Sequence, residues 1–260
     1  MPKTSKPSKS NTQHSPTYLA KKAFFERVLT IYGRHAVMEA LENKSLTIHK
    51  LHLSASNKPS AELDRMVRLA ENRAIEIAQH DKGALSRISR NARQDQGVAL
   101  DVVMDNFITH ETVAARGAYR IIALDGVTNP QNLGMIIRSC AAGRIDALLL
   151  PTRGNAQISP LVIQASAGTL FKLPIIKTPD LARTLEHFAQ SGASVYALDA
   201  DAPIDYRQAN APKAIFVLGN ESDGVSPPIR ARCGASISIP MAREVESLNV
   251  AVTAALIAYA

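Results

Sequence analysis

The sequence predicts an α/β protein built around a mainly parallel, six-stranded sheet with helices on both faces. From Tyr119 onward, short apolar runs alternate with helical patterns, and we expect strands near residues 119–124, 146–150, 173–176, 194–198, 214–218 and 235–239. The runs are continuously apolar, as in 147–150 and 214–218, which is typical of strands that helices cover on both faces. Ligands of open parallel sheets bind beyond the carboxyl ends of the strands, so the loops after these strands are the expected site.

The composition is that of a globular protein without a disulfide or zinc scaffold. With 260 residues, 46% of them apolar, the chain can form two modest domains or one large one. No apolar run reaches the roughly 18 to 20 residues that span a bilayer, and the N-terminus lacks the apolar segment of a secretory signal, so we expect a cytoplasmic protein. We expect Cys140 and Cys233 to be buried in helices, and we expect no metal site.

The formal net charge of +7 is concentrated near the N-terminus. The first 30 residues hold six lysines and arginines against the single acid Glu26. We therefore expect residues 1–27 to form a basic, flexible arm. Such an arm suits a polyanionic partner, because lysines that neutralise phosphates release counterions, but a solubilising tail fits the charge equally well and a transit peptide less well.

Residues 28–104 are predicted to form a small α/β unit. Apolar residues indicate strands at 48–53, 74–77 and 98–103, and an apolar stripe over 63–70 indicates an amphipathic helix. We expect the arginines at positions 87, 90 and 93 to share one helical face, where they either bind phosphates or simply face solvent. Residues 105–117 are expected to be a linker.

The first cluster of polar residues, 125–134 (Asp-Gly-Val-Thr-Asn-Pro-Gln-Asn-Leu-Gly), lies between a strand and a helix. A loop of this kind presents free amides and the positive end of a helix, which suit anionic or polar ligands. The buried stripe of the helix is predicted to be Leu133, Ile136, Ile137 and Cys140. Arg138 therefore points away from the core, and by itself it is an ordinary surface residue.

The second cluster, 218–224 (Leu-Gly-Asn-Glu-Ser-Asp-Gly), directly follows an apolar strand. Gly219 lets a ligand approach the backbone closely, and Glu221 places a carboxylate at the mouth of the expected pocket. The two glycines have the spacing of a phosphate-binding P-loop, but Val225 stands where its lysine is required, which argues against nucleotide hydrolysis.

The third cluster combines Ile-Ser-Ile-Pro-Met at 237–241 with Ser-Leu-Asn-Val-Ala at 247–251. We expect Ser247 to cap the N-terminus of a helix over 248–260. This helix is apolar nearly all round, with Asn249 and Thr253 as its polar stripe, so it must be enclosed by the core or by a subunit contact.

Together, the three clusters resemble the three signature motifs of the SpoU/TrmH branch of the SPOUT methyltransferases over about residues 117–260. The first is similar to the N-x-G-x-x-x-R element of that family, the second to its G-x-E-x-x-G element, and the third to its I-P-M element followed by S-L-N-V. Residues 31–104 resemble the L30e-like substrate-binding domain of many bacterial members, from Tyr32-Gly33-Arg34 to Asp95-Gln96-Gly97. One departure is that Asp95 stands where that domain usually carries histidine.

The resemblance implies a trefoil-knotted catalytic domain over 118–260 and a homodimer whose C-terminal helix contributes to the interface. It implies S-adenosyl-L-methionine as the cofactor, bound by Gly219, Ile239, Met241 and Leu248. It places the catalytic positions at Asn132, Arg138, Glu221, Ser247 and Asn249.

The implied reaction is methyl transfer to a ribose 2'-hydroxyl of structured RNA, with a guanosine of 23S ribosomal RNA as the target that best matches the domain layout. A transfer RNA is the alternative target. Because an arginine is effectively always protonated, we expect Arg138 to bind the adjacent phosphate and stabilise developing alkoxide charge. A catalytically inactive RNA-binding assembly factor and a nucleotide-dependent oxidoreductase are further alternatives; the five intact catalytic positions disfavour the first and the missing G-x-G-x-x-G element disfavours the second.

Overall fold

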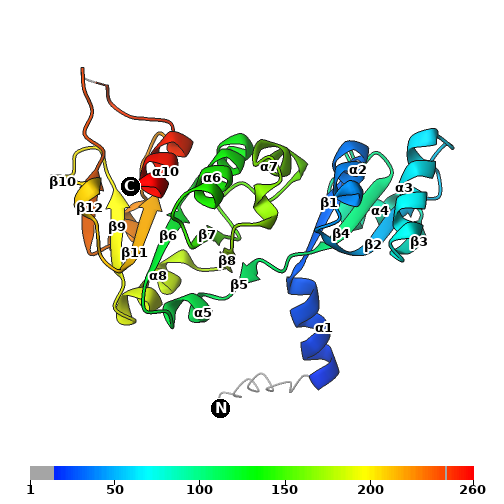
Figure 1. Cartoon of the computed structure of the whole chain (residues 1–260), viewed down its shortest axis with the longest axis horizontal. Coiled ribbons are helices and arrows are strands. Elements are labelled where there is room, and N and C mark those ends of the chain that lie inside the picture. Colours follow the sequence, from blue (N-terminus) through cyan, green and yellow to red (C-terminus); the bar gives the residue numbers. More distant parts are fainter. Residues whose placement is uncertain (1–14, 244) are drawn as a thin grey trace, which may run out of the picture.

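The computed structural model of the chain describes residues 15–243 and 245–260. It contains two sheets, each in an α/β unit of its own, joined by a thin connector (Figure 1). The α/β character expected from the sequence is therefore confirmed for both parts of the chain.

The first unit is a four-stranded sheet in the order β1-β4-β2-β3. Its strands are β1 (Val28–Tyr32), β2 (Thr47–Ser54), β3 (Glu76–His80) and β4 (Val98–Val103), and its helices are α2 (Arg34–Glu42), α3 (Ala61–Asn72) and α4 (Lys82–Ser89). Strand β4 pairs antiparallel with β1 and β2, whereas β2 and β3 are parallel. Strand β1 is the one strand here that the apolar pattern did not indicate.

A chain of side-chain hydrogen bonds crosses all four strands of this sheet. The hydroxyl of Thr30 on β1 donates to Asp101 on β4 at 2.6 Å, and the second Asp101 oxygen lies 3.1 Å from Nε2 of His52 on β2. The Nδ1 atom of His52 lies 2.9 Å from Nε2 of His80 on β3, so one ring donates to the other. Because His52 and Asp101 are both buried, this network satisfies polar groups that would otherwise be costly.

The segments on either side of the first unit are more ordered than the sequence predicted. Residues 16–26 of the expected flexible arm form helix α1 (Pro16–Glu26), which is capped by the Ser15 hydroxyl and whose Phe24 and Phe25 rings pack edge-on against His49. The lysines at positions 3, 6 and 9 lie outside the described residues. The expected linker contains β5 (Phe107–Ile108) and α5 (His110–Ala114), and the side-chain amide of Asn106 donates to the carbonyls of Leu170 and Leu173.

The second unit is a wholly parallel sheet in the order β10-β12-β9-β11-β6-β7-β8-β5. Six of its strands are those predicted from the sequence: β6 (Tyr119–Leu124), β7 (Ala147–Pro151), β8 (Ile175–Thr178), β9 (Ser194–Leu198), β11 (Lys213–Leu218) and β12 (Ala235–Ser238). The sheet has eight strands because two-residue strands, β5 and β10 (Ile204–Asp205), extend its edges. The two edge strands are too short to show a periodicity. The knot stays a prediction of the family resemblance.

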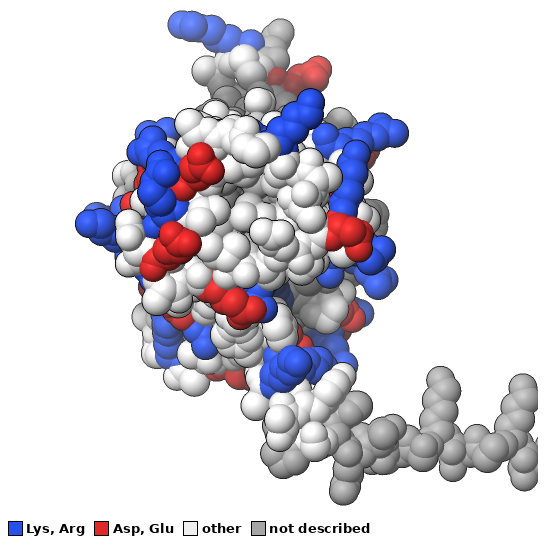
Figure 2. All heavy atoms as spheres, turned by 90° about the vertical axis from the view of Figure 1, so that its right-hand side faces the viewer, with Lys and Arg blue, Asp and Glu red and all other residues white. Residues whose placement is uncertain are grey.

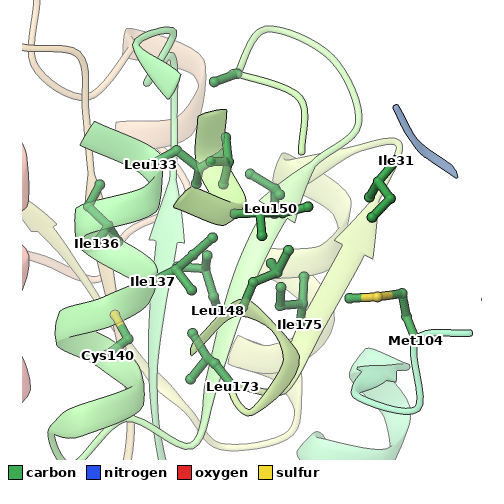
Figure 3. Close-up of a cluster of buried hydrophobic side chains, with 14 of the residues drawn as sticks. Ile31, Met104, Leu133, Ile136, Ile137, Cys140, Leu148, Leu150, Leu173 and Ile175 are labelled. Carbon is green, nitrogen blue, oxygen red and sulfur yellow. The ribbon is translucent and has the colours of Figure 1, made fainter. Parts of the chain in front are cut away.

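The helices of the second unit are α6 (Pro130–Ala142), α7 (Pro160–Ala165), α8 (Leu181–Gln190), α9 (Pro227–Arg230) and α10 (Val250–Tyr259), with the 3₁₀ turns η1 (Thr169–Phe171) and η2 (Tyr206–Gln208). Helix α6 buries the predicted apolar stripe, and its Leu133 and Ile137 side chains point toward Leu148 and Leu150 of β7 (Figure 3). Ser159 occupies the N-cap position of α7, although its hydroxyl makes no capping hydrogen bond.

The three arginines after β3 do not share a helical face, contrary to expectation. Helix α4 ends at Ser89, and Arg90 adopts a left-handed conformation with φ of 55°, so Arg93 lies beyond the helix. All three side chains are exposed. On the end of the molecule that Figure 2 faces, basic side chains are spread around an uncharged centre and interleaved with acids.

Asp95, the residue that departs from the family pattern, is buried and has structural partners. Its carboxylate accepts hydrogen bonds from the Ser89 hydroxyl at 3.1 Å and from the Gly97 backbone N–H at 3.0 Å. It therefore ties the end of α4 to the turn that leads into β4.

Cys140 is buried in α6, as predicted, and burial raises the pKa of its thiol to about 12. Cys233 is only partly buried and follows α9 rather than lying in a helix. Within the described ranges, no helix is long and apolar enough to cross a bilayer, and no cluster of three metal-ligating side chains occurs.

Candidate active site

A cavity of about 410 Å³ opens beyond the carboxyl ends of three neighbouring strands, β9, β11 and β12. This is the position that the topology of an open parallel sheet predicts for a ligand. Six of the residues singled out in the sequence line the cavity: Gly219, Glu221, Ile239, Met241, Ser247 and Leu248. They come from the second and third clusters, so folding brings these two clusters to one place.

The second cluster forms a tight turn at the end of β11. The backbone groups of Asn220 and Gly224 exchange two hydrogen bonds, of 3.1 and 2.9 Å, which fold the turn back on itself. A Cβ atom on Gly219 would lie 1.9 Å from the carbonyl carbon of Gly224, so no other residue fits without moving the backbone. Glycine is therefore required here by the turn itself, besides allowing a ligand to approach.

The first cluster joins β6 to α6 beside this turn. The side chain of Asn129 caps α6 by accepting from the backbone N–H groups of Gln131 and Asn132, and Pro130 occupies the first helical position. The side-chain amide of Asn220 donates to the Gly126 carbonyl at 3.2 Å, which joins the two loops directly. Gly134 allows the close packing of α6 on α7, because a Cβ atom there would lie 2.4 Å from the Cβ atom of Ala165.

One buried amide connects all three clusters. The side-chain amide nitrogen of Asn132 donates to Oε1 of Glu221, and its oxygen accepts from the Asn249 side-chain amide at 3.1 Å. Asn132 is 6% exposed, whereas Glu221 and Asn249 are both exposed. Asn132 therefore holds two solvent-facing polar groups in fixed positions from inside the protein.

The helix of the third cluster begins two residues later than predicted. Asn249 is its N-cap, because its side-chain oxygen accepts from the Ala251 backbone N–H at 2.9 Å. The predicted cap, Ser247, instead lines the cavity and is exposed. Both residue types are good caps, and the bond between Asn249 and Asn132 favours the later start.

Among the nine predicted site residues, Arg138 is the one that neither lines the cavity of its own chain nor takes part in the hydrogen bonds around Asn132. It lies six residues beyond Asn132 on α6, about 9 Å further along the axis and on a different face of the helix. Its side chain is exposed, and no hydrogen bond or ion pair joins it to any residue in the described parts of the chain. Helices α10 and α7 pack against α6, and these three helices carry four apolar side chains that are each more than two-fifths exposed: Met135, Leu161, Val252 and Tyr259.

The cavity also has charged residues that the sequence analysis did not single out. Besides Glu221, it is lined by Asp199, Asp223 and Glu246, against the single lining cation Arg230 in the described residues. Asp199 directly follows an apolar strand, β9, which is the signal that could have identified it. The lining is therefore strongly acidic and favours a cationic ligand.

Comparison with known proteins gives matches along nearly the whole chain. A sequence model of the SpoU rRNA Methylase family matches residues 119–259, and a model described as RNA 2'-O ribose methyltransferase substrate binding matches residues 30–107. An uncharacterised tRNA/rRNA methyltransferase of Mycobacterium sp. (strain KMS) is 32% identical over 87% of this chain and 74% of its own. A tRNA/rRNA methyltransferase assigned to the TrmH family in Staphylococcus saprophyticus is 29% identical over 89% of this chain and 94% of its own.

Solved structures share the architecture. A protein from Porphyromonas gingivalis, assigned to the TrmH family of RNA methyltransferases, superimposes with a TM-score of 0.61 at 26% identity, over 94% of this chain and 91% of that one. The SpoU methyltransferase AviRb from Streptomyces viridochromogenes, solved with AdoMet, superimposes with a TM-score of 0.62 at 22% identity, over 91% of this chain and 90% of that one.

Proposed function

The chain belongs to the SpoU rRNA methylase family of RNA 2'-O-ribose methyltransferases, and from this premise we propose that it methylates a guanosine of 23S ribosomal RNA with S-adenosylmethionine as the methyl donor. The observation that carries the methyl-transfer part of the proposal is the joining of three distant motifs through Asn132 at the edge of an acidic cavity. The choice of target rests on the layout of the two domains. Residues 28–104 would hold the RNA, residues 118–260 would carry out the reaction, and 105–117 would link them.

The cavity fits the proposed donor in shape and in charge. Ile239, Met241 and Leu248 form an apolar wall suited to an adenine ring, and Gly219 allows close approach to the backbone. S-adenosylmethionine supplies a methyl group bonded to a positively charged sulfur. The acidic lining attracts that charge, and the attraction weakens when the sulfur becomes neutral after transfer, which favours release of the product.

The catalytic residues would work mainly by alignment and charge stabilisation. Asn132 fixes Glu221 and Asn249, which together with Ser247 would orient the ribose against the methyl group. Arg138 would bind the phosphate next to the target ribose and stabilise the negative charge that develops on the 2'-oxygen. Replacing Arg138 with lysine tests this role, since nearly normal turnover would exclude a planar, two-pronged contact.

We further propose a homodimer in which Arg138 completes the site of the second copy. Two observations support this arrangement: Arg138 lies outside its own cavity, and exposed apolar side chains lie on α6 and on α10, the helix that also lines the cavity. That helix lines the cavity with Val250 and Thr253 and carries Val252 on its exposed side. An apolar surface of this kind is typical of a subunit interface.

Co-expression of two differently tagged inactive variants tests the shared site. A mixed dimer of Arg138→Ala and Glu221→Ala subunits contains one cavity with both groups intact if Arg138 acts across the interface, and none if it acts within its own chain. We expect the purified mixed dimer to have up to half of the activity of the wild-type dimer, because one of its two cavities is complete. Activity no higher than that of either variant alone would reject the arrangement.

The target is tested by mapping 2'-O-methyl positions in total RNA from cells with and without the gene. We expect one guanosine of 23S ribosomal RNA to lose its methyl group, whereas loss from a transfer RNA would support the alternative target. If calorimetry detected no binding of S-adenosylmethionine, an inactive assembly factor would become the better interpretation.

A further inference from the structure

The carboxylate of Asp199 occupies a position in the cavity that none of the three motifs explains. Asp199 directly follows β9, the strand next to β11, and β11 ends at Gly219. The Asp199 backbone N–H donates to the Ile237 carbonyl at 3.0 Å, so the residue continues the sheet rather than belonging to a loose loop. Residues 198–200 all line the cavity.

Arg230 holds this carboxylate in place. Its guanidinium Nη1 donates to Oδ2 of Asp199, while Oδ1 accepts from the Asp201 backbone N–H at 3.2 Å. The helix that carries Arg230 is itself anchored, because the Ser226 backbone N–H donates to Oδ2 of Asp125 at the end of β6. Asp199 is therefore a carboxylate of fixed orientation.

The other acids of the cavity are more exposed than Asp199. The Asp199 side chain is 22% exposed, whereas Glu221, Asp223 and Glu246 are all exposed residues. Glu221 is bound by Asn132, and Asp223 and Glu246 have no ion pair within the described residues. If the cavity needed only negative charge, the exposed acids would suffice without an arginine to orient one of them.

A fixed carboxylate at the end of a parallel strand is suited to a pair of neighbouring hydroxyl groups. In dinucleotide-binding sheets, an acid at the end of the strand beside the glycine-bearing strand accepts hydrogen bonds from a ribose. Here Asp199 and Gly219 likewise follow two adjacent parallel strands, β9 and β11. The glycine-rich element of those sheets is absent from this chain. The remaining lone pairs of both Asp199 oxygens are available to such donors.

We propose that Asp199 accepts hydrogen bonds from the ribose hydroxyls of the methyl donor's nucleoside, and that Arg230 is the positioning residue that orients it. The inference rests on the proposed function, because it takes the cavity to hold S-adenosylmethionine. It predicts that the site discriminates between a ribose and a deoxyribose in its own cofactor, separately from any recognition of the RNA ribose.

Calorimetric titration of S-adenosylhomocysteine and its 2'-deoxy and 3'-deoxy analogues tests the proposal without relying on catalysis. We expect the wild-type protein to bind at least one deoxy analogue about 10- to 100-fold more weakly, the range for a hydrogen bond to a charged group. Asp199→Asn keeps the side-chain volume, and we expect it to bind S-adenosylhomocysteine about tenfold more weakly than the wild type does. We expect the difference in affinity between S-adenosylhomocysteine and its deoxy analogues to fall below about threefold in this variant.

Asp223→Asn is the matched control, because it removes an equal charge from the same cavity and should keep the discrimination. Asp199→Glu is a second variant that keeps the charge but displaces the carboxylate, and it should lose the discrimination. Arg230→Gln should weaken it as well, since the carboxylate is then no longer oriented. Circular dichroism of each variant verifies that it is folded.

The possible failures are distinguishable. A wild-type protein that binds neither S-adenosylmethionine nor S-adenosylhomocysteine would reject the proposed function itself. A wild-type protein that binds the parent ligand and both deoxy analogues equally well would overturn the role of Asp199 alone. Equal loss of S-adenosylmethionine binding in Asp199→Asn and Asp223→Asn, with unchanged discrimination, would also overturn it, because the acids would then act through charge only.

Discussion

Replacing Asn132 with alanine removes the one side chain that joins the three motifs. The substitution deletes one hydrogen bond to a carboxylate, worth about 1.5–3 kcal/mol, and one between amides, worth about 0.5–1.5 kcal/mol. Both partners, Glu221 and Asn249, are exposed, so water can replace the lost bonds. We therefore expect the free energy of unfolding to fall by only about 1–2 kcal/mol and the melting temperature by about 2–8 °C.

The activity of Asn132→Ala should fall much further than its stability. Glu221 and Asn249 lose their common support, and a displacement of about 1 Å in an aligned site can cost about 100-fold in rate. Asn132 does not line the cavity, so the affinity for S-adenosylmethionine should stay within about threefold of that of the wild type.

Single-turnover methyl transfer to RNA, calorimetry and thermal denaturation separate these three effects. Gln131→Ala is the matched control, because Gln131 lies on the same turn of α6 with an exposed side chain. Turnover of Asn132→Ala within twofold of the wild type would refute the alignment role. A loss of cofactor binding as large as the loss of rate would show instead that the variant disrupts the cavity.

Four further predictions follow from the same structure. Gly219→Ala should weaken S-adenosylmethionine binding in calorimetry by more than about tenfold, because the added Cβ atom would meet the Gly224 backbone. Gly117→Ala is the control and should have no effect, because no atom lies within 4 Å of the added Cβ atom. Equal affinities of the two variants for S-adenosylmethionine would contradict the prediction. Burial and the neighbouring His52 lower the pKa of His80, so the unfolded chain binds a proton at this side chain more readily than the folded protein does. The free energy of unfolding, measured in urea, should therefore fall as the pH drops below about 6.5. His80→Gln should reduce this dependence of stability on pH. Burial raises the pKa of Asp101, but hydrogen bonds from His52 and Thr30 outweigh it and leave the pKa lowered, so a further loss of stability is expected below about pH 4. Val252→Glu should give monomers in light scattering with an unchanged melting temperature, whereas a persistent dimer would exclude α10 from the interface.

The local features of the catalytic unit could be predicted because they depend on short stretches of chain. Strands β6 and β9 have the predicted bounds, because each is a short run of mostly apolar and β-forming residues. The buried stripe of α6 followed from helical periodicity alone. The start of α10 was missed because Ser247 and Asn249 are both good caps, and the choice between them depends on a bond to Asn132, 117 residues away.

Residue chemistry and spacing along the chain thus determined most of the strands, the buried stripe of α6, the family resemblance and the nine candidate site residues. Only the tertiary structure decided which of those residues meet: it joins Asn132 to Glu221 and Asn249, leaves Arg138 outside the cavity, and pairs Asp199 with Arg230. The physical reason is that helix and strand formation follow local periodicity, whereas contacts between strand ends depend on the order of strands in the sheet. The order β12-β9-β11-β6 leaves no periodic signal in the sequence, yet it brings these strand ends and their loops together.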